Sequence, residues 1–156
     1  MLLTGTFPRT LDEKQRVALP KPLRAALADA ANDGLFVAPG TDGSLVLYTP
    51  DNFRSLAKRL AEAPSAGGDV RAFGRLFYAN AAHAEIDGQG RIRIPQELAK
   101  WADLKSEVVL VGVGDHIELW DVAKWQAYVQ QHQAHYDQLS EAALDRTIAN
   151  TVKNPR

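Results

Sequence analysis

Apolar and polar residues alternate in two short segments of the chain, residues 16–19 and 91–94. Such alternation places apolar side chains on one face and polar side chains on the other, which is typical of a half-buried strand. Each segment follows a turn-forming stretch that begins with an aspartate, and each precedes a proline and a short amphipathic pattern. We therefore expect a turn, a strand and a short helix at both places.

The similarity between the two places continues downstream and indicates an internal repeat. The aspartates, arginines and prolines of the two segments coincide at an offset of 75 positions. Each segment is then followed by two apolar strand patterns around a glycine-containing turn, at residues 35–48 and 109–120, and by a longer helical pattern. The chain is thus expected to contain two tandem copies of one unit, at residues 4–60 and 79–130.

The remaining segments predict a linker, one further helix and a polar tail. Residues 61–78 combine a stretch rich in Gly, Pro and Ser with a helical pattern from 70 to 78. Residues 131–156 complete a polar tail rich in helix-favouring residues. The apolar positions that lead into and along this tail are sparse and suit docking on a neighbouring subunit better than a core: Val129, Tyr136, Leu139, Leu144 and Ile148.

The repeated unit predicts an α+β fold that is rich in β-strands, with helices flanking the strands. A single βαββ unit of this size buries too little surface to be stable alone. Two units that face each other across a pseudo-two-fold axis can share one core. We therefore expect one domain with internal symmetry rather than two separate domains.

Composition narrows the classes of function. The 156 residues contain no cysteine, which excludes disulfide scaffolds, thiolate metal sites and cysteine nucleophiles. No apolar run approaches the roughly 18 residues of a membrane span, and the N-terminus has no signal-peptide pattern, so we expect a soluble cytoplasmic protein without a membrane partner. The net charge of -1 excludes a DNA binder that relies on bulk positive charge.

The charge is nevertheless segregated along the chain. Residues 1–24 and residues 54–75 each carry a net charge of +3, whereas residues 25–53 carry -4 and residues 101–125 carry -3. The segment 85–100, which contains the second turn, has no net charge. A local basic face is thus available for nucleic acid, and the first copy is expected to contact DNA more than the second.

The arginine that ends each turn is the main candidate for contact with DNA. Arg16 has a guanidinium fork that can bond the two major-groove acceptors of guanine, while Lys14 and Arg9 suit phosphate contacts. As a structural alternative, each arginine pairs with the aspartate four residues before it and holds the turn. An acid that faced phosphate would weaken binding, so Asp12 and Asp87 are expected to be structural.

Other patterns of reactive side chains are weak. His132 and His135 have a helical spacing that can present two metal ligands, but no third ligand is suitably spaced, so a solvated helix face is expected. Gly112-x-Gly114 fits a hairpin turn better than a dinucleotide fingerprint. We expect no enzymatic activity, no metal and no cofactor. The tryptophans are expected to anchor the core or a subunit interface: Trp101, Trp120 and Trp125.

The two Asp-x-x-x-Arg turns and the stretch 109–125 resemble the MraZ family of bacterial transcriptional regulators, over roughly residues 5–130. The resemblance implies two SpoVT/AbrB-like halves in one swapped-hairpin barrel and a ring-shaped homo-oligomer in the cytoplasm and nucleoid. It also implies sequence-specific binding of double-stranded DNA at repeated promoter-proximal sites upstream of its own operon in the division and cell-wall gene cluster. Together with the charge pattern, it indicates these DNA-binding residues: Arg9, Lys14, Arg16, Lys21, Arg91 and Arg93.

The chain departs from the family pattern at two places. Gln15 stands where the family usually has a glycine before the arginine, whereas the second copy keeps Gly90, and the N-terminus lacks the usual basic residue. Acidic segments and the polar tail leave an alternative function open, a ring-forming protein scaffold that binds DNA only incidentally. An aspartyl hydrolase would need a hydroxyl residue and a glycine after each turn aspartate, and a single-copy antitoxin is disfavoured by the duplication.

Overall fold

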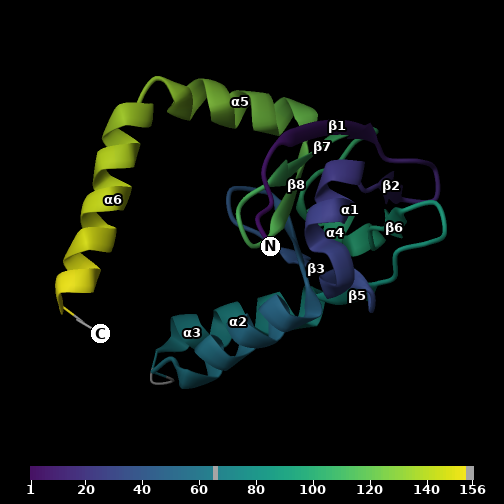
Figure 1. Ribbon diagram of the computed structural model, residues 1–156. Helices are drawn as coiled ribbons and strands as arrows, with labels where there is room; N and C mark the ends of the chain where they lie inside the picture. Colours follow the sequence, from purple (N-terminus) through teal and green to yellow (C-terminus); the bar gives the residue numbers. More distant parts are fainter. Residues whose placement is uncertain (65–66, 154–156) are drawn as a thin grey trace. The chain divides into compact units, whose positions relative to one another are not determined.

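The computed structural model describes residues 1–64 and 67–153, and it describes side chains up to residue 145 (Figure 1). The chain forms two compact units, which comprise Met1–Val122 and Ala123–Arg156. Each unit is described by itself. The first unit contains all of the described strands and the two Asp-x-x-x-Arg turns, so it is the part that bears on the candidate site.

Each half of the first unit follows the predicted plan. The strand of the 16–19 segment and the short helix after it are present, as are the predicted hairpin and the longer helix. The first half contains β1 (Thr6–Thr10), β2 (Arg16–Ala18), α1 (Lys21–Leu27), the 3₁₀ helix η1 (Ala28–Ala31), β3 (Leu35–Pro39), β4 (Leu45–Tyr48) and α2 (Pro50–Glu62). Helix α3 (Gly68–Asn80) follows the first half, and the second half contains β5 (Ala82–Ala84), β6 (Arg91–Arg93), α4 (Gln96–Trp101), β7 (Glu107–Gly112) and β8 (Ile117–Asp121).

The strands form two antiparallel sheets in which the halves exchange strands. The six-stranded sheet has the order β1-β7-β8-β4-β3-β5, and β2 pairs with β6 in a separate two-stranded sheet. The first strand of each half therefore pairs with the other half, β1 with β7 and β5 with β3. The predicted α+β class with two tandem halves is confirmed, and the exchange explains why neither half is a separate domain.

The strand register obeys the pseudo-two-fold relation between the halves. In the two-stranded sheet Val17 lies opposite Ile92, its counterpart in the repeat. In the six-stranded sheet Val46 of β4 lies opposite Glu118 of β8, which also occupies the matching position of the other half. Both central pairs thus join equivalent positions, as a pseudo-two-fold axis between the halves requires.

The core lies where the two sheets and the two short helices meet. Burial of each large aliphatic side chain contributes about 1.5–3 kcal/mol, so the shared core stabilises both halves together. Its fully buried members come from both halves: Val17, Leu23, Leu35, Leu47, Ile92, Ile94, Leu98, Leu110, Ile117 and Leu119.

Helices α2 and α3 pack their aromatic side chains against β3 and β4. Phe53 of α2 stacks on Phe36 of β3 with ring centroids 4.3 Å apart, and on Phe77 of α3 at 5.8 Å. Thr49 caps α2, because its hydroxyl accepts the backbone N–H of Asn52 at 3.2 Å. The helix predicted at 70–78 is therefore present as α3, although its outer positions Phe73 and Leu76 are about half exposed.

The second unit contains α6 (Tyr136–Lys153) and all of α5 (Val122–Gln133) except its first residue. Of the sparse apolar positions predicted in the tail, Tyr136, Leu139 and Leu144 are exposed, and the side chain of Ile148 lies outside the described residues. Among the described residues, no helix is long and apolar enough to cross a membrane. Of the three tryptophans, Trp120 is buried in the first unit, whereas Trp101 is 44% exposed.

Candidate nucleic-acid interface

The first Asp-x-x-x-Arg turn is held by the carboxylate of Asp12. One oxygen, Oδ1, accepts the backbone N–H of Lys14 at 2.9 Å and that of Arg16 at 2.8 Å. The other oxygen, Oδ2, accepts Nε of the Arg16 guanidinium at 2.8 Å. The aspartate thus closes the turn and fixes the base of the arginine side chain at the same time.

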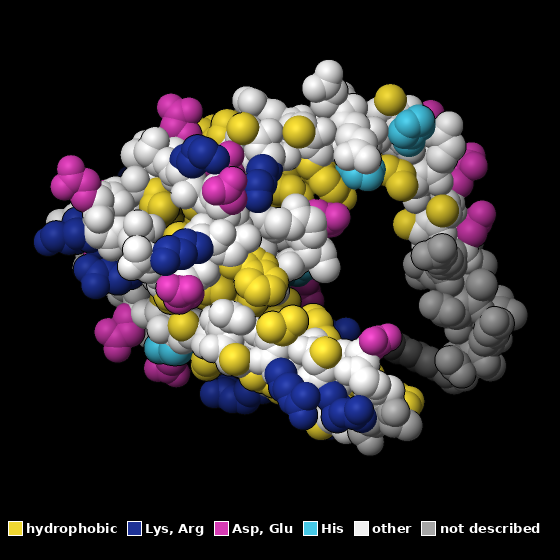
Figure 2. Space-filling model, turned by 180° about the vertical axis from the view of Figure 1, so that it is seen from behind, with side chains coloured by type: hydrophobic (Ala, Val, Ile, Leu, Met, Phe, Trp, Pro, Cys, Tyr) yellow, Lys and Arg dark blue, Asp and Glu magenta, His cyan; other side chains and the backbone are white. Residues whose placement is uncertain are grey.

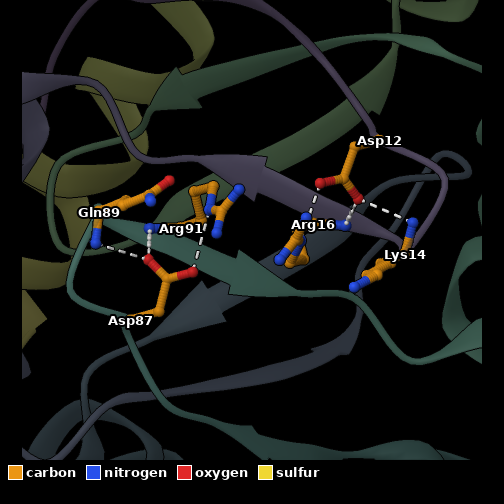
Figure 3. Close-up of polar contacts among 6 residues, drawn as sticks. All are labelled: Asp12, Lys14, Arg16, Asp87, Gln89 and Arg91. Carbon is orange, nitrogen blue, oxygen red and sulfur yellow. Dashed lines mark hydrogen bonds and ion pairs between the residues drawn. The ribbon is translucent and has the colours of Figure 1, made fainter.

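The second turn repeats these contacts atom for atom. Oδ1 of Asp87 accepts the backbone N–H groups of Gln89 and Arg91, both at 2.9 Å, and Oδ2 accepts Nε of Arg91 at 3.0 Å. In Figure 3 the two arginines lie between the two aspartates, on strands that run in opposite directions. The repeated sequence motif therefore forms one geometry twice.

The surroundings of both aspartates lower the pKa of their carboxyl groups. The backbone N–H of Arg16 is the main cause for Asp12, and the backbone N–H of Arg91 is the main cause for Asp87. Both carboxylates are therefore charged at neutral pH. Their charge is directed toward the turn and the arginine, which limits its repulsion of an approaching phosphate.

The residue before each arginine has a left-handed backbone. Gly90 has a φ of 77°, which costs glycine little, and Gln15 has a φ of 62°, which is unfavourable for a residue with a side chain. In addition, Oε1 of Gln15 is buried with no hydrogen-bond partner among the described residues. The departure from the family pattern at Gln15 keeps the turn geometry but adds local strain to the first copy.

The outer face of the two-stranded sheet β2–β6, here called the arginine ribbon, gathers three arginines. Arg16 lies opposite Arg93, and Arg91 lies opposite Ala18, while Val17 and its partner face the core. Like charges directly opposite each other destabilise a sheet. The protein thus keeps a cationic pair at a position where folding alone disfavours it.

The guanidinium groups of the ribbon remain accessible. The side chains of Arg16 and Arg91 are 28% and 27% exposed, and their ion pairs use Nε, which leaves the terminal nitrogens outside those contacts. Arg93 is exposed and makes no ion pair with any residue that the structure describes. The three arginines line a surface cavity of about 540 Å³, together with His83, Glu85 and Asp87.

The other predicted site residues lie outside the ribbon, on three different elements of the fold. Lys14 is exposed in the first turn, and Lys21 lies on α1 next to the second turn, where it lines another cavity. Arg9 lies on β1 of the six-stranded sheet, and its Nη1 donates to the carbonyl of Pro8 at 2.7 Å. The structure therefore brings Arg16, Arg91 and Arg93 together, but it does not bring Arg9 onto the ribbon.

One cation next to the second turn, Arg24, is not among the predicted site residues. Arg24 of α1 lines a cavity of about 640 Å³ with Lys21, Asp87 and Gly88. On the face that Figure 2 shows, Lys and Arg side chains are interspersed with Asp and Glu side chains. Arg24 belongs to the first copy and the turn to the second, so no spacing within either copy indicates the contact. The pairing of β2 with β6 places them together, because α1 follows β2.

A second cluster of titratable groups lies away from the ribbon, at the β7–β8 hairpin. Nδ1 of His116 is 2.8 Å from Oδ1 of Asp115, and its Nε2 is 3.9 Å from Oε2 of Glu118. The nearby carboxylate of Glu118 is the main cause that raises the pKa of His116, and the imidazole of His116 in turn lowers the pKa of Glu118. Burial raises the pKa of Tyr48, whose ring centroid is 6.1 Å from that of His116.

The residues described in the structure contain no group of three or more His, Cys, Asp or Glu side chains that could hold a metal ion. The predicted helical spacing of His132 and His135 is wrong as a statement about one helix. His132 lies in α5, which ends at Gln133, and His135 lies in the turn before α6. The backbone N–H of His135 closes that turn on the carbonyl of His132 at 3.0 Å.

These features define an internally duplicated α+β protein whose halves exchange strands and share one arginine-bearing ribbon. The family model described as "MraZ protein, putative antitoxin-like" matches the chain twice, over residues 2–76 and 77–147. The chain belongs to the MraZ family.

Curated relatives agree with the family model over nearly the whole chain. A protein of Saccharopolyspora erythraea is 37% identical over 143 residues, which cover 92% of this chain and 97% of the relative. Proteins of Natranaerobius thermophilus and Rhodococcus jostii are 34% and 35% identical over 94% of this chain and 100% of each relative. All three bear the name "Transcriptional regulator MraZ".

Proposed function

We propose that this chain is a transcriptional regulator that binds double-stranded DNA through the arginine ribbon and acts without catalysis. The observation that carries the proposal is the cross-strand pair of Arg16 and Arg93, with Arg91 on the same outer face. The major groove of B-DNA is about 12 Å wide and admits a two-stranded β-ribbon. The names of the relatives support the regulatory role.

The two turns suit sequence-specific contact. Asp12 and Asp87 hold Nε of Arg16 and Arg91, so the terminal nitrogens of each guanidinium are oriented before DNA arrives. An oriented fork loses less side-chain entropy when it bonds the O6 and N7 atoms of guanine. The pseudo-two-fold axis at Val17 relates the two forks, as a two-fold axis relates the strands of a DNA duplex.

Substitution of the two arginines tests the proposal. Arg16→Ala and Arg91→Ala are each expected to weaken binding to the DNA upstream of the chain's own coding sequence by about 1–3 kcal/mol, the typical value of one bidentate contact to a base. Lys105→Ala removes an exposed positive charge that pairs with Asp103 and serves as the control. Unchanged affinity in both arginine variants, measured by fluorescence anisotropy at one salt concentration, would contradict the proposal.

The proposal includes a ring-shaped homo-oligomer on repeated promoter-proximal sites, in the operon of division and cell-wall genes. Exposed apolar side chains on α3, namely Phe73, Leu76 and Tyr78, support contact between copies. A ring presents one ribbon per subunit, so individually weak sites gain affinity through avidity. Light scattering measures the mass directly, and a monomer at working concentrations would contradict the ring. Such a regulator would reside in the cytoplasm, at the nucleoid.

The same exposed face supports a second candidate, a protein-interaction scaffold with incidental DNA binding. A salt titration separates the two functions, because non-specific DNA binding weakens steeply as salt increases. Preference for the upstream DNA over a scrambled duplex at physiological salt favours the regulator. Equal, weak binding of both duplexes favours the scaffold.

A further inference from the structure

Helix α1 of the first half lies directly over the second Asp-x-x-x-Arg turn. A side-chain carbon placed on Gly90 would be 2.5 Å from Nη1 and 2.7 Å from Cζ of Arg24. The backbone explains this position: the N–H of Leu19 donates to the carbonyl of Gly90 at 2.9 Å, and the chain enters α1 two residues later. The guanidinium of Arg24 thus occupies the space that a side chain at Gly90 would need.

Two cations at this place lack a counter-charge from any residue that the structure describes. Lys21 and Arg24 are exposed and line the cavity of about 640 Å³ beside Asp87 and Gly88. Among the described residues, neither side chain forms an ion pair, and Asp87 is already engaged by Arg91. The cavity therefore carries an uncompensated positive charge next to the ribbon.

We propose that Lys21 and Arg24 form a phosphate-binding site for the DNA backbone at the edge of the arginine ribbon. The inference rests on the proposed function, since the ribbon fixes where the duplex lies. Both cations stand on a helix beside the ribbon, not on its outer face. A duplex whose major groove receives the ribbon presents its phosphates to the flanking elements, and phosphate contacts fix its register.

The second copy does not repeat this pair of cations at the matching positions of its own short helix. At the positions of α4 that match Lys21 and Arg24, the second copy has Gln96 and Ala99. The first turn instead carries its own cation, Lys14, where the second turn has Gln89. Each turn thus has a basic neighbour, but all of these neighbours come from the first copy.

A salt titration with charge-neutral variants tests the site. The variants are Lys21→Gln, Arg24→Gln and the double variant, and Arg24→Gln keeps a side chain over Gly90. The control is Lys105→Gln, which removes one exposed charge that pairs with Asp103. Binding to the chain's own upstream DNA and to a scrambled duplex is measured at several salt concentrations, and circular dichroism verifies folding.

The slope of log K against log salt changes by about 0.9 for each phosphate that the protein no longer neutralises. The double variant is expected to lower the slope by nearly two such steps and to weaken both duplexes by the same factor. An unchanged slope in the folded single variant Lys21→Gln and in the double variant overturns this site. If Arg16→Ala still weakens specific binding in that case, the proposed function stands; if the unaltered protein binds neither duplex, both fail.

Discussion

The two Asp-x-x-x-Arg turns contain equivalent hydrogen bonds but differ in the side chains that surround them. Arg24 covers the second turn at Gly90, whereas the first turn has the strained Gln15. In the sequence, Ala99 occupies the position of the second copy that matches Arg24. The second turn combines a glycine with a large neighbour, whereas the first turn has a side chain at its left-handed position and the residue that matches Arg24 is small. The copies thus keep one backbone geometry through compensating differences in the residues around it.

The charge around each turn in the fold differs from the charge of its segment in the sequence. By sequence, the segment that contains the second turn has no net charge. In the fold, Lys21 and Arg24 of the first copy lie beside that turn, so its surroundings are basic. The cations of one copy therefore serve both turns, and unequal charge in the sequence does not produce one basic turn and one neutral turn.

The largest expected effect comes from Gly90→Gln, which gives the second turn the residue of the first. The new residue would keep a φ of 77°, and its Cβ would lie 2.5 Å from Nη1 of Arg24. A left-handed residue with a side chain costs about 1–2 kcal/mol. The overlap adds little, because the Arg24 guanidinium is the exposed end of a flexible side chain and can move aside. Urea unfolding measures the loss of stability. Arg24→Ala in the same chain is expected to leave most of this loss in place, because the backbone conformation causes it. Full recovery of stability with Arg24→Ala would show that the overlap, and not the backbone, causes the loss.

The next effect comes from the aspartates. Asp12→Ala and Asp87→Ala each remove an acceptor of three hydrogen bonds, so both are expected to lower the thermal midpoint by several degrees. Asp87→Ala should cost less, because Gly90 adopts the turn without strain whereas Gln15 relies on the carboxylate to hold it. Thermal unfolding at neutral pH compares the two variants. A larger loss in Asp87→Ala would contradict this difference between the turns.

A smaller effect depends on pH and is confined to the second copy. The neighbouring carboxylates raise the pKa of His116, and its counterpart in the first copy is Ser44, which cannot titrate. A group whose pKa is higher in the folded than in the unfolded state stabilises the fold at pH values below its unfolded pKa. This stabilisation is lost as the pH rises through its folded pKa. The unaltered protein should therefore melt at a higher temperature than His116→Asn. The difference in melting temperature should be largest near pH 6 and smaller near about pH 8. A constant difference in melting temperature between the two would contradict the ion pairing of His116.

The sequence predicts the local elements well because their causes are local. Alternation at 91–94 predicts β6, the prolines mark where α1 and α4 begin, and the aspartate spacing predicts both turns. Two features join positions that are far apart in the sequence: the pairing of β2 with β6, and the exchange of β1 and β5 between the halves. These strand pairings depend on the shared core and not on local sequence. For the same reason the local sequence does not predict the contact of Arg24 with the second turn, which joins the two copies.

The smallest expected effect is the reverse exchange in the first turn, Gln15→Gly. Glycine removes the left-handed strain and the buried unpartnered Oε1, but it also increases the entropy of the unfolded chain. These opposing changes leave a net stabilisation of up to about 1 kcal/mol. Urea unfolding is the measurement, and the slope against denaturant should not change. A clear destabilisation would mean that the Gln15 side chain fills the space above the first turn as Arg24 does above the second, so that packing outweighs backbone strain there.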